Sequence, residues 1–197
     1  MSLLRRRMMM DTKPAQDWDI VWDYTMGLPE NNEFDIFTDS VVSIEETENG
    51  IKIIPSASGY VRYIPKNYEL CNEGIFEVAV NIRNLPNSNG FRMMLSNGVA
   101  NSAGVNIEAL QIYVNSFVRN SVKYQSTNIA DIISDISLNT ECVFRAERIG
   151  GVNYVYLNGQ KIKESTDSVS AYAPKNRILF QSGGEYLLKS IKFKKIS

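Results

Sequence analysis

The clearest pattern of apolar and polar positions runs from Cys142 to Glu164, CVFRAERIGGVNYVYLNGQKIKE. Its first part, CVFRAER, alternates small or apolar residues with charged ones, which is the period of a half-buried strand. Gly150-Gly151 supplies the positive φ angles that a tight hairpin requires, and Asn158-Gly159 gives the next turn after VNYVYL. The segment therefore predicts three antiparallel strands in a β-meander.

The same alternation recurs over most of the chain. The segment GIFEVAVNIRN has large apolar residues at every second position: Phe76, Val78, Val80 and Ile82. In the first expected strand, 17–25, Trp18, Ile20 and Trp22 share one face in the same way. Further strands are expected at 41–45, 51–54, 60–65, 91–98, 105–117, 122–126, 177–181 and 186–195. About ten to thirteen short strands with regular turn signals predict a sandwich or barrel.

One stretch departs from the alternation. In NIADIISDISL, from Asn128 to Leu138, isoleucines recur at intervals of three and four, which is helical spacing: Ile129, Ile132, Ile133 and Ile136. We expect a short helix or an irregular crossing loop there.

The pattern also predicts the domain organisation. No repeat of fixed period and no linker interrupts 17–197, so we expect a single β-sandwich domain over these residues. The preceding segment 1–16 contains RRRMMM and lacks the apolar core of a signal peptide. We expect it to be an arm outside the domain, either disordered or vector-derived.

Composition narrows the chemistry open to such a domain. The 197 residues are 44% hydrophobic and 22% charged, with a net charge of −1. The sequence has no histidine, which excludes Ser-His-Asp and Cys-His catalysis and histidine-ligated zinc. Acid-base chemistry would fall to Asp, Glu, Tyr or Lys. We expect no nucleic-acid partner, since no basic stripe occurs, and no membrane span, since no apolar run approaches roughly 20 residues.

The two cysteines, Cys71 and Cys142, each precede an expected strand. They can form one disulfide if those strands begin close together, or they can remain two buried thiols. Two cysteines are too few for a disulfide scaffold or a zinc ribbon. We favour the thiols, because cysteine is among the residues most often fully buried.

Three stretches of the chain carry a resemblance to a known family. They are VWDYTMGLPENNEFDIF with the hairpin VVSIEETENGIKIIPSA, the sheet pair GIFEVAVNIRNLPNSNGFRMML, and FRAERIGGVNYVYLNGQKI with the closing RILFQSGGEYLLKSIKFKKI. Together they resemble the concanavalin A-like lectin/glucanase jelly roll, a family that includes laminin G-like modules. The resemblance implies an all-β, two-sheet antiparallel jelly-roll sandwich over nearly the whole body of the chain.

The resemblance also implies a function. It implies a non-catalytic, lectin-like carbohydrate-binding module in a surface or secreted protein, with an extracellular, cell-surface or virion location. A glycoside hydrolase of the glucanase-like fold and a phage or surface assembly protein are the alternatives, because one fold hosts many activities. Only two tryptophans occur, both in the first expected strand, whereas a glycanase cleft usually presents several exposed aromatics.

The carboxylates of a glucanase are incomplete in this sequence. The family's retaining glucanases carry a Glu-x-Asp-x-Glu motif on one strand, and the chemistry needs two carboxylates about 5 to 5.5 Å apart. Glu33 and Asp35 match the first two positions, but Phe37 stands at the third. The sequence therefore assigns no catalytic residue.

Alternation also selects candidate sugar-binding residues. A sugar site needs aromatic rings beside polar groups that can bond hydroxyls. The residues that alternate with the expected core positions could line one concave surface: Arg92, Gln111, Tyr113, Asn115, Tyr124, Arg145 and Glu147. The alternative is an ordinary solvent-facing sheet surface, where such residues are common.

The resemblance also implies that calcium is a candidate metal, since calcium is common in that fold. Several aspartates lie near the start of the chain: Asp17, Asp19, Asp23, Asp35 and Asp39. No D-x-D-x-D-G loop occurs, and the closing strand SIKFKKIS has no carboxylate to complete a site. We therefore expect no cofactor and assign no metal site, with structural calcium as the alternative that these residues do not support. The oligomeric state stays open.

Overall fold

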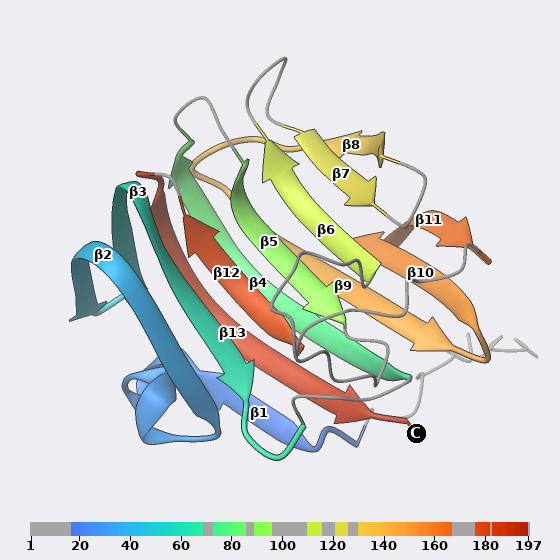
Figure 1. Ribbon diagram of the computed structural model, residues 1–197, viewed down its shortest axis with the longest axis horizontal. Coiled ribbons are helices and arrows are strands. Elements are labelled where there is room, and N and C mark those ends of the chain that lie inside the picture. The colour runs from blue at the N-terminus through green and yellow to red at the C-terminus, as the bar shows by residue number, and fades with distance from the viewer. Residues whose placement is uncertain are drawn as a thin grey trace, which may run out of the picture.

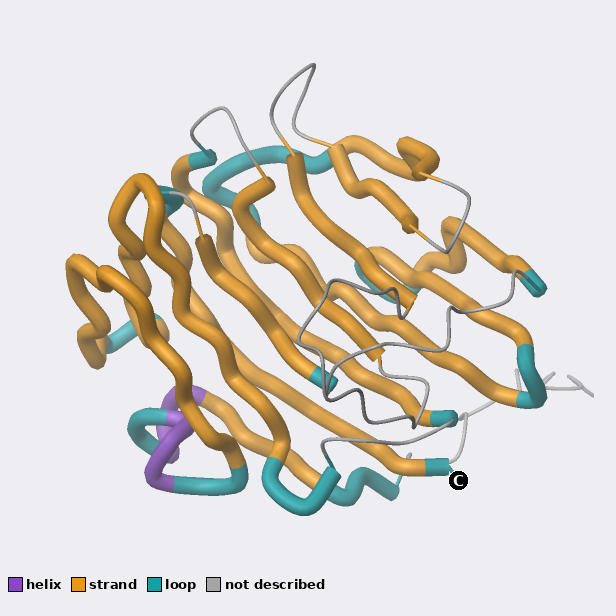
Figure 2. Tube along the Cα trace, in the orientation of Figure 1, coloured by secondary structure: helices purple, strands orange, loops and turns teal. Residues whose placement is uncertain are grey.

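The chain is almost entirely β in the parts that the structure describes. The computed structural model describes residues 17–68, 73–85, 89–95, 110–115, 121–125, 130–166, 176–181 and 183–196. These residues form strands and two short 3₁₀ helices, η1 (Tyr24–Met26) and η2 (Pro29–Asn31) (Figure 2). Within the described residues, no helix is long and apolar enough to cross a membrane.

Within the described residues, thirteen strands pair into one antiparallel sheet, in the order β11-β10-β9-β4-β13-β3-β12-β5-β6-β7-β8, with β1 beside β13 and β2 beside β3 (Figure 1). The first half contains β1 (Ile20–Asp23), β4 (Gly74–Asn84), β9 (Glu141–Ile149), β10 (Val152–Leu157), β11 (Gln160–Ser165) and β13 (Glu185–Lys195). The second half contains β5 (Asn89–Leu95), β6 (Leu110–Asn115), β7 (Ser121–Gln125), β8 (Ala130–Asp135) and β12 (Arg177–Gln181).

The two halves are joined by β3 (Gly50–Pro65), which forms a long hairpin with β2 (Phe34–Thr47). The early part of β3, at 51–53, pairs with β13, whereas its later part, at 60–63, pairs with β12. The sheet curls through this strand, so that β5 and β6 of the second half contact β9 of the first half. This curl encloses the core between the two halves.

The core is built from the inward-facing positions of both halves. The expected row on β4 is confirmed, because Phe76, Val78, Val80 and Ile82 are all buried in it. Aromatic rings join the halves: the centroid of Phe91 on β5 lies 5.0 Å from that of Phe144 on β9. The ring of Phe180 on β12 lies 5.5 Å from Phe91. Aromatic contacts at these separations add to the free energy of burial.

The β-meander predicted from Cys142 to Glu164 is confirmed as β9, β10 and β11. Gly150 and Gly151 have φ angles of 59° and 75°, and Asn158 and Gly159 have 51° and 80°. All four φ angles are therefore positive, as tight two-residue hairpin turns of type I′ require. The residues of these two turns therefore allow β9, β10 and β11 to pair with one another in sequence order.

The helix or crossing loop expected at 128–138 is wrong. The structure has strand β8 at Ala130–Asp135, paired in antiparallel register with β7. Isoleucine is β-branched and favours strands, so spacing at three and four was a weaker signal than the residue type and the pairing with β7.

Cys142 is a buried free thiol, as favoured from the sequence. Burial, followed by the nearby charge of Glu141, raises the pKa of this thiol above its ordinary value. A raised pKa keeps the thiol protonated and unreactive at neutral pH. Cys71 and the expected arm at 1–16 lie outside the described residues.

We expect Phe144→Ala to lower the free energy of unfolding by about 3–5 kcal/mol, because it opens a cavity where the two halves of the sheet meet. Urea denaturation followed by circular dichroism measures this loss. The control is Ile132→Ala on β8, where the side chain is 40% exposed, and it should change stability by less than about 0.5 kcal/mol. Equal losses at the two positions would contradict the central role of Phe144.

Candidate functional site

The structure separates the candidate sugar-binding residues between two surfaces. Arg145 and Glu147 lie on β9, and Arg92 lies on β5. Each of these three residues directly follows a residue that faces the core. Because Phe91 and Phe144 meet inside the core, Arg92 and Arg145 point away from it on opposite outer faces. The expected single surface is therefore not formed.

The remaining candidates belong to the second half of the sheet. Gln111, Tyr113 and Asn115 alternate along β6, and Tyr113 pairs in register with Arg92. On β7, Tyr124 pairs with Ile112, whereas the residue that pairs with Tyr113 is Lys123. Alternation within a strand predicts which residues share a face of that strand, but it does not give the register of the neighbouring strand.

A row of polar residues crosses the outer face of the first half. Lys192 on β13 pairs in register with Glu77 on β4, and Glu77 pairs with Arg145 on β9. Arg145 pairs in turn with Tyr156 on β10. Directly paired residues of an antiparallel sheet share a face, so these four side chains lie next to one another. With Glu147 they form what we call the polar row.

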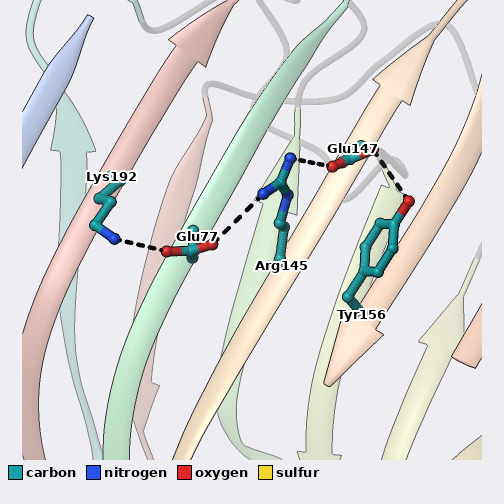
Figure 3. Close-up of polar contacts among 5 residues, drawn as sticks. All are labelled: Glu77, Arg145, Glu147, Tyr156 and Lys192. Atoms are coloured by element: carbon teal, nitrogen blue, oxygen red, sulfur yellow. Dashed lines mark hydrogen bonds and ion pairs between the residues drawn. The ribbon is translucent and has the colours of Figure 1, made fainter. Parts of the chain in front are cut away.

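The polar row is connected by ion pairs and hydrogen bonds (Figure 3). Lys192 Nζ donates to Glu77 Oε1 at 2.9 Å, and Arg145 Nη1 lies 3.8 Å from Glu77 Oε2. The second amino group of Arg145 pairs with Glu147 Oε1. Tyr156 completes the row, since its hydroxyl donates to Glu147 Oε2 at 3.4 Å. The guanidinium of Arg145 therefore lies between the two carboxylates.

The polar row is more buried than an ordinary ion pair on a protein surface. Glu147 is only 6% exposed, although it faces away from the apolar core. A buried carboxylate is costly unless charged and hydrogen-bonding partners compensate it, and Arg145 and Tyr156 supply both. The row is thus a fixed arrangement of donors and acceptors.

Aromatic rings flank the guanidinium of Arg145. Its central carbon lies 5.6 Å from the ring of Trp18 and 5.7 Å from the ring of Tyr156. The ammonium of Lys192 lies 5.7 Å from the same Trp18 ring. These distances are in the range of cation–π contacts, which orient the cations between the rings.

The position of Trp18 corrects the sequence expectation. Ile20 and Trp22 do lie in the core, as their alternation predicted, but half-buried Trp18 contacts the polar row on the outer face. The regular strand β1 begins at Ile20, so the alternation does not extend back to Trp18. Sequence reasoning also missed Lys192 and Tyr156, because their place in the site depends on cross-strand register.

A pocket of about 250 Å³ opens beside the polar row. Glu77, Arg145, Tyr156 and Gly159 line it. Gly159 belongs to the turn between β10 and β11, where an added Cβ would meet no atom within 4 Å. The pocket thus combines one aromatic wall with charged donors and acceptors and an open turn.

The environment of Tyr156 keeps its hydroxyl protonated. Burial raises its pKa above the ordinary value, and the charge and hydrogen bond of Glu147 raise it further. Arg145 and Lys161 oppose this effect. The hydroxyl therefore remains a neutral donor near the pocket at physiological pH.

The other expected positions lie away from this pocket. Glu33, Asp35 and Phe37 are exposed, and the last two lie on β2, which pairs with β3. Among the described residues, no group of three or more Cys, Asp or Glu side chains is arranged to hold a metal ion. The expectation about calcium stays a prediction.

Comparisons with known proteins identify the fold. No protein-family model matches the sequence, and no curated protein matches it. The solved structures do include similar chains. The carbohydrate-binding module CBM66 from Bacillus subtilis aligns with a TM-score of 0.57 at 12% identity, over 83% of this chain and 98% of that one.

Two further structures are similar over most of this chain. The exoplasmic/lumenal domain of VIP36, in its Ca²⁺/Man3GlcNAc-bound form, aligns with a TM-score of 0.58 at 10% identity over 86% of each chain. A Trypanosoma rangeli sialidase in complex with sialic acid gives a TM-score of 0.58 at 12% identity, over 81% of this chain and 28% of the sialidase. The chain thus spans less than a third of the sialidase. At such identities the likeness shows the fold alone, an antiparallel β-sandwich.

Proposed function

We propose that this protein is a non-catalytic carbohydrate-binding module of the concanavalin A-like jelly-roll type. The ligand site is the pocket beside the polar row. The observation that carries this proposal is the convergence of the Tyr156 ring with the paired side chains of Arg145 and Glu77 at one pocket. The similarity of the fold to the carbohydrate-binding module CBM66 and to the Man3GlcNAc-bound domain of VIP36 supports the same class of ligand.

The chemistry of the pocket suits a sugar ring. The apolar face of a pyranose or furanose packs on an aromatic ring, and its hydroxyls need both donors and acceptors nearby. Tyr156 supplies the ring, Arg145 supplies donors and Glu77 supplies acceptors. Pockets for drug-sized ligands occupy roughly 300–1,000 Å³. At about 250 Å³ this pocket is suited to one sugar unit, with the rest of a glycan extending into solvent.

The arrangement favours binding over hydrolysis. A glycosidase places two carboxyl groups on either side of the scissile bond, with space for the sugar or a water between them. Here the guanidinium of Arg145 occupies the space between Glu77 and Glu147 and pairs with both (Figure 3). The two carboxylates therefore hold the arginine in place and leave no position between them for a glycosidic bond.

Tryptophan fluorescence offers a direct test, because the two tryptophans report on different places. Trp18 contacts the polar row, whereas Trp22 is fully buried and donates from Nε1 to the carbonyl of Gly27 at 3.0 Å. A glycan array of neutral and charged saccharides first identifies a binder. We expect titration of that saccharide to change the Trp18 emission, and Tyr156→Ala to weaken binding about tenfold, or about 1.4 kcal/mol.

The matched control is Phe37→Ala, since Phe37 is an exposed aromatic on β2 and should leave the affinity unchanged. A second control, Trp18→Phe, should remove the fluorescence change and leave the Trp22 emission. No binder on the array, or a binder with equal affinity for the Tyr156→Ala protein, would overturn the proposed site. Release of reducing sugar from that binder would replace binding with hydrolysis.

The hydrogen bond from Tyr156 to Glu147 gives a separate prediction. We expect Glu147→Gln to lower the pKa of Tyr156 towards its ordinary value near 10, because the substitution removes the neighbouring negative charge. Because folding raises the pKa of Tyr156, its protonated hydroxyl contributes to the free energy of unfolding. That contribution is fully present below about pH 10, the ordinary pKa of tyrosine, and is lost as the pH rises through the pKa of the folded state. NMR titration of ¹³Cζ-labelled tyrosine measures the shift. Glu45→Gln, at an exposed site on β2, is the control and should leave the Tyr156 titration unchanged.

A further inference from the structure

The outer face of the second half carries arginines from three neighbouring strands. Leu179 on β12 pairs in register with Arg62 on β3 at one side and with Arg92 on β5 at the other. Arg177, two residues before Leu179, pairs with Met94 on β5. β12 lies between β3 and β5 (Figure 1). Because Leu179 pairs directly with both Arg62 and Arg92, and Arg177 lies two residues before Leu179, the three arginines share one face. We call Arg62, Arg92 and Arg177 the arginine cluster.

The core fixes the direction of the arginine cluster. The residues next to it in sequence are fully buried between the two halves of the sheet: Val61, Tyr63, Phe91, Met93 and Ile178. Alternation then directs the arginines to the outer face. That face is itself shielded here, since the outward residues Leu179 and Met94 are 7% and 6% exposed. The guanidinium groups are therefore held near one another where water screens their charges poorly.

In the part of the chain that the structure describes, the contacts of Arg62 and Arg177 include no carboxylate. Arg62 lies over the Tyr60 ring at 4.9 Å, and its buried Nε has no hydrogen-bond acceptor among the described residues. Arg177 donates from Nε to the Met94 sulfur at 2.9 Å, which is a weak acceptor. Within the described part of the chain, no carboxylate forms an ion pair with either of them.

The electrostatics of Arg177 agree with this geometry. Burial, followed by the like charges of Arg62 and Arg92, lowers its pKa to about 10. That value is still well above neutral pH, so the guanidinium stays charged. Arg62 and Arg177 therefore keep two positive charges close together beside Arg92, at a cost in stability that an anion would relieve.

We propose that the arginine cluster binds an oxyanion, as a second ligand site on the face opposite the sugar pocket. The planar fork of a guanidinium matches two oxygens of a carboxylate, sulfate or phosphate, and several forks around one anion provide charge-assisted hydrogen bonds. The polar row cannot serve in this way, because its cations are already paired with Glu77 and Glu147. The oxyanion is a free inorganic ion or the acidic group of a saccharide.

The test uses the whole protein and three anionic probes at constant ionic strength. The probes are sodium sulfate, a sulfated heparin hexasaccharide and an oligogalacturonate hexamer, with neutral maltohexaose for comparison. We expect an anion to raise the thermal midpoint and to shift the arginine Nε–Hε signals of the cluster in NMR spectra. Arg177→Gln and Arg62→Gln should each weaken binding about tenfold or more. Binding of sulfate alone assigns a free ion, and binding of the hexamers alone assigns an acidic saccharide.

The matched control is Arg83→Gln, which removes the same charge from an arginine of β4 whose side chain is 42% exposed. It should leave anion binding unchanged. Arg177→Gln should not lower the thermal midpoint of the anion-free protein, because it removes like-charge repulsion, so lost binding would not reflect unfolding. Arg177→Lys keeps the charge without the fork and should bind with intermediate affinity. No response of the wild-type protein to any anion, or equal binding by the Gln variants, would overturn the proposal.

Discussion

The packing of Phe91 against Phe144 and Phe180 is the contact on which the rest of the structure depends. These rings come from β5, β9 and β12, so they join the two halves of the curled sheet. Successive residues of a strand point to opposite faces, and an inward Phe144 therefore requires an outward Arg145. An inward Phe91 requires an outward Arg92 in the same way. A shift of one residue in the register of β5 or β9 would turn its phenylalanine outward and its arginine into the core. The packing of the aromatic core therefore also fixes the two arginines on the outer faces.

Alternation and turn residues predicted much of this from the sequence. They gave the inward row of β4, the three strands of the meander and the positive φ angles at its turns. They also placed Arg145 and Glu147 on one face of β9, where the two side chains form an ion pair. They could not show that Arg92 and Arg145 lie on opposite surfaces, because the pattern within a strand does not record how a sheet curls.

The other differences from the sequence expectation also arise from tertiary structure. The isoleucines of β8 fit a helix by spacing, but pairing with β7 makes the segment a strand. Trp18 fits the alternation of Ile20 and Trp22, yet it precedes β1 and contacts Arg145 and Lys192 instead. The polar row required the register of four strands, since its members are separated by up to 115 positions in the chain. Cross-strand register is set by packing in the core and leaves little trace in the local pattern.

The two outer faces differ in how their charged side chains are arranged. In the polar row, Lys192 and Arg145 are matched by Glu77 and Glu147, so the row carries no net charge and each side chain is held by its partners. Such an arrangement suits a neutral ligand rich in hydroxyls, because its donors and acceptors are already ordered and binding sacrifices little side-chain freedom. In the arginine cluster, like charges stand together, and the burial of the neighbouring Leu179 and Met94 indicates that water screens their repulsion poorly. A negatively charged ligand would relieve the repulsion between these arginines, and that relief would add to its affinity. The two outer faces of the sandwich therefore suit different ligands, a neutral one at the polar row and an anionic one at the arginine cluster.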